Sequence, residues 1–321
     1  MGIISGLIIY TLFCTIDYRT LMRWGYFCYI GVVGLLIFTL IKGSIGMGAQ
    51  RWINLGFIKL QPSELTKLLF PAFATYYFYT QKDMIDTSWS NMWPVLATLG
   101  CSFILILKQP DLGTALILLF SSLLFLWLLG VHTKFFIIGA LTVLSLTPVL
   151  WLGLKPYQKK RITVFLGYGD SKKERYHIEQ SKIAIGSGGL TGKGFLHGTQ
   201  NKLLFLPESR TDFIFAVICE EWGFIGALFI LFLYFMLFAR LIFITRTIKS
   251  PLIQLFAISI VMHIIISAII NIGMVIGLLP VVGIPLPMIS YGISYLWTTF
   301  ASLGWFNSIA MRRFYMSIQQ Q

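Results

Sequence analysis

The chain has 321 residues, of which 57% are hydrophobic and only 12% are charged, and its mean hydropathy is +0.80. This composition excludes a water-soluble globular domain and predicts an all-α, polytopic integral membrane protein. The formal net charge of +13 does not indicate a nucleic-acid-binding protein, because Lys and Arg gather at lipid headgroups and in the cytoplasmic loops of membrane proteins.

Nine hydrophobic segments are candidate membrane spans. They lie near 2–16, 24–42, 63–80, 92–107, 113–130, 134–153, 223–244, 253–279 and 294–310. Several are shorter than the roughly 20 residues that an untilted helix needs to cross the hydrocarbon core. Because the nine segments extend over the whole chain and only one long interval separates them, we expect residues 1–321 to form a single membrane domain with one large loop at 155–210. The chain opens on an apolar segment without a basic region or cleavage site, so no removable signal peptide is expected.

Lys and Arg residues in the short loops predict the orientation, because they are enriched on the cytoplasmic side. Alternate loops on one side carry nine of them: Arg19, Arg23, Lys82, Lys134, Arg240, Arg246, Lys249, Arg312 and Arg313. The opposite short loops carry five: Lys42, Arg51, Lys59, Lys67 and Lys108. The side with nine, which includes the C-terminus, is expected to be cytoplasmic, and the loop 155–210 extracytoplasmic. The many charges of that long loop point the other way, but long loops follow the rule poorly.

The segment from Lys155 to Arg210 is the only long polar stretch of the chain. It contains eleven Lys and Arg residues against four acids, so its net charge is +7. It includes the glycine-rich sequence GSGGLTGKG and leads to Asp212 at the head of a hydrophobic segment. This pattern suggests an anionic, lipid-linked substrate handled by a single general base. The glycine-rich sequence lacks the Walker order, which disfavours a nucleotide site, but its glycines and Lys193 suit a diphosphate headgroup.

Two further polar segments are candidate sites. In QPSELTK, which begins at Gln61, Pro62 can open a helix, and an ordinary helix start explains much of the pattern. Glu64 and Lys67 lie on one helical face at the hydrocarbon boundary, where charge is costly and is usually paired or functional, so we favour a function. In KQPDLGT, Asp111 is equally suited to cap the next helix or to belong to a site.

The residues alone leave two other roles open. Asp212 at a helix start is equally compatible with a helix cap and with a general base. The segment 280–292 contains three prolines and is predicted to be non-helical; it would line a substrate cavity or simply join two helices.

Five motifs, in this order, resemble the SEDS (shape, elongation, division and sporulation) family of bacteria, and within it the RodA branch more than FtsW. They are GAQRWINLGFIKLQPSELTK, KQPDLGTALI, RYHIEQSKIAIGSGGLTGKGFLHGTQ, FLPESRTDFIFAVICEEWGFIG and GLLPVVGIPLPMISYGIS. The resemblance runs from about Gly6 to Arg313. It implies a peptidoglycan glycosyltransferase that polymerises lipid II (undecaprenyl-diphospho-disaccharide-pentapeptide) during cell elongation. The enzyme would act at the outer face of the bacterial cytoplasmic (inner) membrane, with a class B penicillin-binding protein as partner.

The resemblance also implies the site residues. The essential aspartate of the family corresponds to Asp212. The expected substrate-binding residues are Arg51, Trp52, Gln61, Ser63, Glu64, Lys108, Gln109, Asp111, Gln180, Lys182, Lys193, Glu208, Ser290 and Ser294. Glu220 is expected to be a helper or a structural pairing group rather than a second catalyst.

One carboxylate is sufficient for this chemistry. A diphosphate leaves without protonation, whereas glycoside hydrolysis needs two carboxylates. Asp212 would take the proton from the 4-hydroxyl of the acceptor GlcNAc as that oxygen attacks the anomeric carbon of MurNAc with inversion. Lys and Arg side chains, or a divalent cation such as Mg²⁺ or Mn²⁺, would stabilise the charge on the departing diphosphate. No other cofactor is expected.

The chain departs from the family in two respects. The closing motif usually reads S-Y-G-G-S-S, and here Ile293 and Tyr295 replace a glycine and a small residue; because a β-branched residue resists positive φ, we expect altered backbone geometry there. Family members have ten spans, and the first is expected to be missing here. Two alternatives stay open: a lipid II flippase, which should tolerate Asp212→Asn, and an inactive scaffold that recruits a penicillin-binding protein.

Overall fold

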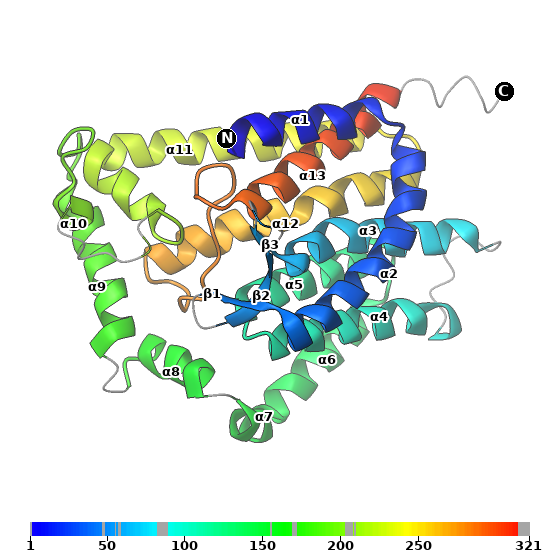
Figure 1. Ribbon diagram of the computed structural model, residues 1–321, viewed down its shortest axis with the longest axis horizontal. Coiled ribbons are helices and arrows are strands. Elements are labelled where there is room, and N and C mark those ends of the chain that lie inside the picture. The colour runs from blue at the N-terminus through cyan, green and yellow to red at the C-terminus, as the bar shows by residue number, and fades with distance from the viewer. Residues whose placement is uncertain are drawn as a thin grey trace. The chain divides into compact units, whose positions relative to one another are not determined.

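The computed structural model describes residues 2–46, 49–54, 56, 59–81, 89–154, 156–168, 172–202, 208 and 210–313. Helices dominate these residues (Figure 1). The hydrophobic helices are α1 (Gly2–Thr15), α2 (Tyr18–Lys42), α3 (Pro62–Thr80), α4 (Trp89–Lys108), α5 (Leu112–Leu128), α6 (Thr133–Ser145), α7 (Thr147–Gly153), α11 (Ile214–Arg246), α12 (Pro251–Val275) and α13 (Ile293–Arg312). Three further helices are α8 (Pro156–Phe165), α9 (Lys172–Ser187) and α10 (Thr199–Lys202).

The helices agree with the predicted membrane class. By length and composition, α2, α4, α11 and α12 can each cross a membrane, and the pair α6 and α7, bent by 51°, is a fifth candidate. The apolar helices α1 and α5 are shorter. Each of the nine predicted spans coincides with a hydrophobic helix or with the α6–α7 pair. The all-α polytopic class is therefore confirmed, and the number of nine crossings stays a prediction.

The chain divides into two compact units. The first comprises Met1–Val131, Phe238–Ile266 and Gly292–Gln321, and the second comprises His132–Leu237 and Ser267–Tyr291. The helices α11 and α12 each contribute one part to each unit.

In the first unit, α1 packs along α13 and α2 packs along α3 (Figure 1). Glycines permit the close approach of α1 and α13, because a Cβ at Gly6 would meet the ring of Phe300 and a Cβ at Gly304 would meet the main chain of Tyr10. Arg312 closes this pair, since its guanidinium donates to the carbonyl oxygen of Thr15 at 2.6 Å. The end of α1 thus receives a donor for a carbonyl group that the helix itself leaves unpaired.

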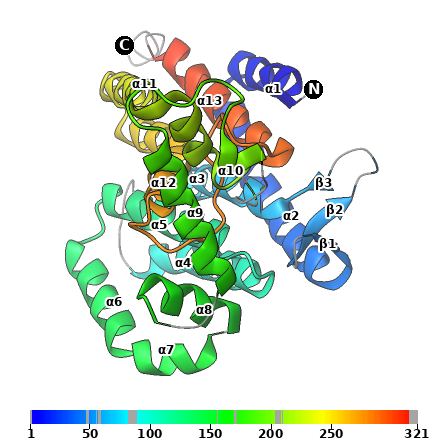
Figure 2. The same cartoon turned by 90° about the vertical axis from the view of Figure 1, so that its left-hand side faces the viewer.

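A small antiparallel sheet stands beside α2 in the same unit (Figure 2). Its strands are β1 (Ser44–Gly46), β2 (Ala49–Asn54) and β3 (Lys59–Leu60), in the order β1-β2-β3. Ser44 pairs with Trp52, and Ile53 with Leu60. This sheet was not predicted from the sequence.

In the second unit, the predicted polar loop 155–210 contains the helices α8, α9 and α10. The glycine-rich sequence that follows α9 packs on α11 at a kink, where Gly223 has a φ of +66°. The amide of Phe224 donates to the carbonyl oxygen of Gly189 at 2.9 Å, and that of Lys193 donates to Glu220 at 3.0 Å. The loop therefore pairs main-chain groups of α11 around a break in its own hydrogen-bond ladder.

Candidate active site

Asp212 lies at the end of a tight turn in the second unit. The amides of Thr211 and Asp212 both donate to the carbonyl oxygen of Glu208 at 3.1 Å, and Glu208 itself has a φ of +57°. The carboxylate of Glu208, a predicted site residue, accepts from the hydroxyl of Thr211 at 3.0 Å. Because α11 begins at Ile214, the half-buried side chain of Asp212 precedes the usual cap position of that helix.

The non-helical segment between α12 and α13 holds this turn. The amide of Tyr291 donates to the carbonyl oxygen of Arg210 at 2.9 Å. The hydroxyl of Ser290 donates to the carbonyl oxygen of Thr211 at 2.5 Å. The same Ser290 hydroxyl accepts from the amide of Leu286 at 2.7 Å. The prediction of non-helical backbone over 280–292 is confirmed. The hydroxyl of Ser290 joins two main-chain segments, and the predicted contact of Ser290 with substrate stays a prediction.

Two glycines of that segment lie directly against charged side chains. A Cβ at Gly283, where φ is +74°, would lie 3.4 Å from the carboxylate oxygen Oδ2 of Asp212. A Cβ at Gly277, where φ is +82°, would lie 2.8 Å from the amine of Lys182 on α9. Lys182 is exposed. In the second unit, the carboxylate of Asp212 and the amine of Lys182 therefore each lie against a glycine with a left-handed backbone conformation.

Lys193 has a partner within the same unit. Its amine lies 2.7 Å from the carboxylate oxygen Oε1 of Glu220 and 2.9 Å from the hydroxyl of Thr199. Glu220 was expected to be a helper or pairing group, and it forms this pair. A part for Lys193 in binding a diphosphate stays a prediction, since its charge is already compensated here.

The first unit gathers a second group of predicted site residues around Asp111. Its carboxylate lies 3.3 Å from the guanidinium of Arg51 on β2 and accepts from the side-chain amide of Gln61 at 2.6 Å. The hydroxyl of Ser63 donates to it at 3.2 Å. Asp111 also accepts from the amide of Thr114 at 3.3 Å as the N-cap of α5. Asp111 therefore caps α5, one of the two roles that the sequence left open, and its membership of a substrate site stays a prediction.

A buried ion pair lies on α3 in the same unit. The amine of Lys67 is 2.7 Å from the carboxylate of Glu64, and both side chains are almost inaccessible to solvent. The ring of Tyr295 lies with its centroid 5.1 Å from that amine. The neighbouring Ser294 donates to the carbonyl oxygen of Lys59 at 2.8 Å, so it joins α13 to β3.

The expected distortion at Ile293 is absent. Ile293 is the first residue of α13, and among the described residues with a side chain, positive φ values occur only at Pro110, Leu196, Glu208 and Met288. The preceding Gly292 has a φ of 166°, which is extended backbone. The prediction of a backbone conflict was therefore wrong, because the position opens a helix and does not require a left-handed residue.

The remaining predicted site residues are dispersed. Trp52 is half-buried on β2, and its ring lies 5.9 Å from the guanidinium carbon of Arg51. Lys108 is exposed at the end of α4. Gln109 is fully buried and donates to Thr39 of α2 at 2.7 Å, which indicates a packing role. Gln180 is half-buried on α9.

One residue of the site was missed by sequence reasoning. Asn271 is fully buried on α12 and donates to the carbonyl oxygen of Asp212 at 2.9 Å. An asparagine inside an otherwise apolar helix is the signal that could have indicated it, because a buried amide needs hydrogen-bond partners.

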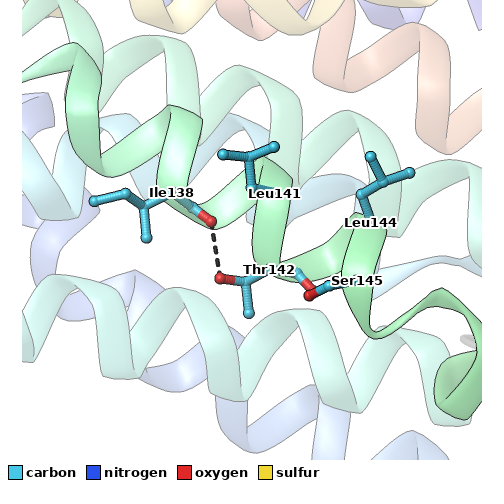
Figure 3. A pocket seen from close by; sticks show the side chains of 5 residues that line it. All are labelled: Ile138, Leu141, Thr142, Leu144 and Ser145. Atoms are coloured by element: carbon cyan, nitrogen blue, oxygen red, sulfur yellow. Dashed lines mark hydrogen bonds between the residues drawn. The ribbon is translucent and has the colours of Figure 1, made fainter.

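A shallow hollow on α6 is a separate feature (Figure 3). All five of its lining residues belong to that helix: Ile138, Leu141, Thr142, Leu144 and Ser145. The hydroxyl of Thr142 donates to the carbonyl oxygen of Ile138 at 2.8 Å, and that of Ser145 donates to Thr142 at 3.0 Å. Its polar groups are thus satisfied within the helix, and none of the predicted site residues lines it.

The described residues contain no cluster of side chains suited to bind the predicted divalent cation. Within the part of the chain that the structure describes, no group of three or more His, Cys, Asp or Glu side chains lies together. We therefore assign no residue to a metal ion.

Comparison with known sequences shows the family of the chain. The sequence model of the FtsW, RodA and SpoVE proteins, described as cell cycle proteins, matches residues 1–315. The chain belongs to the FtsW/RodA/SpoVE family. Within this family, it is 39% identical over 313 residues to the peptidoglycan glycosyltransferase MrdB of Escherichia coli (strain K12), an alignment that covers 97% of this chain and 84% of that one. The family that the motifs predicted is thereby confirmed.

Two solved structures of FtsW/RodA/SpoVE relatives share the fold. One belongs to a peptidoglycan synthase complex that coordinates polymerisation and crosslinking; it has a TM-score of 0.82 and 29% identity, with 98% of this chain and 88% of that chain covered. The other is the rod shape determining protein RodA of Thermus thermophilus, with a TM-score of 0.70 and 27% identity, covering 98% and 86% of the two chains.

Proposed function

We propose that this member of the FtsW/RodA/SpoVE family is a peptidoglycan glycosyltransferase that polymerises lipid II, with Asp212 as its general base. The observation that carries the proposal is the environment of Asp212. It is a half-buried carboxylate on a fixed turn, and the backbone of Gly283 lies close to its oxygen Oδ2. Relatives over nearly the whole chain are named peptidoglycan glycosyltransferases, which supports the same activity here.

The reaction needs one proton acceptor and a stabilised leaving group. Asp212 takes the proton of the acceptor GlcNAc 4-hydroxyl while its oxygen forms a bond to the anomeric carbon of MurNAc. The bond from that carbon to the phosphate oxygen breaks on the opposite face, with inversion, and the lipid diphosphate leaves as an anion. A fixed turn favours this step, because a base that is already positioned need not be ordered during the reaction. The exposed amine of Lys182 is the cation of this unit that we assign to the leaving group.

The proposed function also implies a membrane location and a protein partner for the chain. The chain would lie in the bacterial inner membrane with its C-terminus in the cytoplasm and residues 155–210 outside. A class B penicillin-binding protein would supply crosslinking; a solved relative that belongs to a peptidoglycan synthase complex supports such a partner. The residues of the Asp111 cluster and the Glu64–Lys67 pair would contribute to substrate binding. A Mg²⁺ or Mn²⁺ requirement stays a prediction.

Polymerisation of lipid II tests the function. The purified chain, with its penicillin-binding partner, should convert lipid II into glycan strands, and both Asp212→Ala and Asp212→Asn should abolish the product at equal protein levels. Asp17→Asn is the matched control, because Asp17 is a half-exposed acid that caps α2 far along the chain from Asp212. Polymer made equally well by Asp212→Asn would refute the base assignment. Unimpaired lipid II translocation into vesicles by that variant, without polymer from the wild type, would identify a flippase instead.

A further inference from the structure

The turn that carries Asp212 is held through three consecutive main-chain carbonyl groups. The carbonyl oxygen of Arg210 accepts from the amide of Tyr291, that of Thr211 accepts from the hydroxyl of Ser290, and that of Asp212 accepts from the side-chain amide of Asn271. The donors come from the segment after α12 and from α12 itself. The position of Asp212 is therefore fixed by bonds to its backbone from outside the turn, in addition to the bonds within the turn.

Asn271 bonds two segments through its side-chain nitrogen. Its Nδ2 donates to the carbonyl oxygen of Asp212 at 2.9 Å and to that of Ile284 at 2.7 Å. Both hydrogens of the amide are used, and the contact with two carbonyl oxygens fixes which end of the amide is the nitrogen. The side chain is fully buried. Burial strengthens these bonds and makes them costly to lose.

The two segments that Asn271 joins lie on either side of the contact between Gly283 and the proposed base. One carries Asp212. The other carries Gly283, the neighbour of Ile284, whose Cβ position lies 3.4 Å from Asp212 Oδ2. A shift of either segment would therefore change the distance between the carboxylate and the backbone of Gly283. Tyr234 of α11 adds a further hold on the second segment, because its hydroxyl donates to the carbonyl oxygen of Pro287.

We infer that Asn271 is a positioning residue for Asp212: it holds the base and the backbone of Gly283 at a fixed separation, which admits the acceptor hydroxyl. This inference rests on the proposed function of Asp212. Ser290 has the same role from the other end of the segment, since its hydroxyl donates to Thr211 and accepts from Leu286. Its hydroxyl is thereby committed to the main chain, which argues for positioning rather than for contact with substrate.

Steady-state kinetics of lipid II polymerisation test the inference. Asn271→Leu keeps the number and branching of the side-chain heavy atoms and removes both donated hydrogen bonds. We expect its kcat to fall roughly ten- to hundredfold, the scale of a misplaced catalytic group. The apparent KM for lipid II should be unchanged, because the residue acts only on the positioning of the base in the reaction. Ser259→Ala is the matched control: Ser259 is a buried polar residue of α12 whose hydroxyl bonds within the helix to Leu255, and its kcat should equal that of the wild type.

A second variant protects the test against a folding defect. Ser290→Ala removes the adjacent bond with a smaller change, so it decides the question if Asn271→Leu does not yield folded protein. Folded protein is recognised by a cooperative unfolding transition above the assay temperature and by the wild-type elution volume in detergent. A reduced kcat at constant KM in the folded variant supports positioning.

The outcomes also separate this inference from the proposed function. If Asp212→Ala abolishes polymerisation while folded Asn271→Leu or Ser290→Ala keeps the wild-type kcat, positioning by this segment is refuted and the base assignment stands. A raised KM at wild-type kcat refutes it as well, since that result indicates substrate binding. If Asp212→Ala itself retains polymerisation, the proposed function fails first.

Discussion

The amine of Lys193 lies 2.7 Å from the carboxylate oxygen Oε1 of Glu220. The carboxylate is fully buried and also accepts from the amide and the hydroxyl of Thr199, at 2.8 and 2.9 Å. The pair therefore attaches the glycine-rich loop and the start of α10 to the middle of α11. Glycines that resemble a phosphate-binding loop in the sequence allow close contact with a kinked helix in the structure.

Loss of this pair should weaken the fold. Lys193→Met leaves Glu220 buried without its counter-charge, and we expect it to destabilise the protein by about 3 kcal/mol, the lower end for breaking a buried ion pair, because Lys193 is partly exposed. Unfolding in detergent by denaturant measures this loss. Lys134→Met, which changes an exposed lysine at the start of α6, is the control and should be neutral. Equal stability of the two variants would show that the pair contributes nothing.

The ring of Tyr295 should stabilise the buried amine of Lys67. A desolvated cation–π contact is worth about 2 kcal/mol, and phenylalanine preserves the ring face that makes it. We therefore expect Tyr295→Phe to retain most of the stability and Tyr295→Leu to lose about 2 kcal/mol or more, because leucine also fills the site less well. Thermal unfolding of the two variants compares them directly. An equal loss in both would assign the effect to the hydroxyl group instead.

The helices were predictable from the sequence, and several contacts of the site were not. Long apolar segments identify their helices without tertiary information, since hydropathy alone defines them. The sheet was missed because β1 has three residues and β3 has two, too few for an alternating pattern. Asp212 was found through its motif, whereas Asn271 was not, because its partners are main-chain carbonyl groups that no residue type reveals. Ile293 was misjudged because the motif does not show that its position opens a helix.

Two variants of Asp111 distinguish the stability contributed by the helix cap from that contributed by the charge pair with Arg51. Asn can still cap α5 but loses the charge that faces Arg51, whereas Ala loses both. We expect Asp111→Asn to destabilise the protein by about 2 kcal/mol, as for a lost hydrogen bond to a charged group, and Asp111→Ala to cost about 1 kcal/mol more through the lost cap. Denaturant unfolding of both variants and of Asp17→Ala, a change at the N-cap of α2, provides the comparison. If Asp111→Asn matches the wild type, the cluster is only a cap.

The space beside Asp212 can be closed without touching a charged residue. Alanine at Gly283 has to adopt a φ of +74°, and its Cβ would contact the carboxylate oxygen of Asp212, so it occupies the space that we assign to the acceptor hydroxyl. Gly130→Ala is the matched control, because Gly130 has a φ of +106° and a Cβ there would meet no described heavy atom within 4 Å. Both variants should lose about 1–2 kcal/mol of stability from the backbone strain. Only Gly283→Ala should also lose lipid II polymerisation, by at least about tenfold in kcat, since the acceptor can no longer approach the base. Equal activity of the two variants, at equal stability, would mean that the acceptor reaches Asp212 from another side.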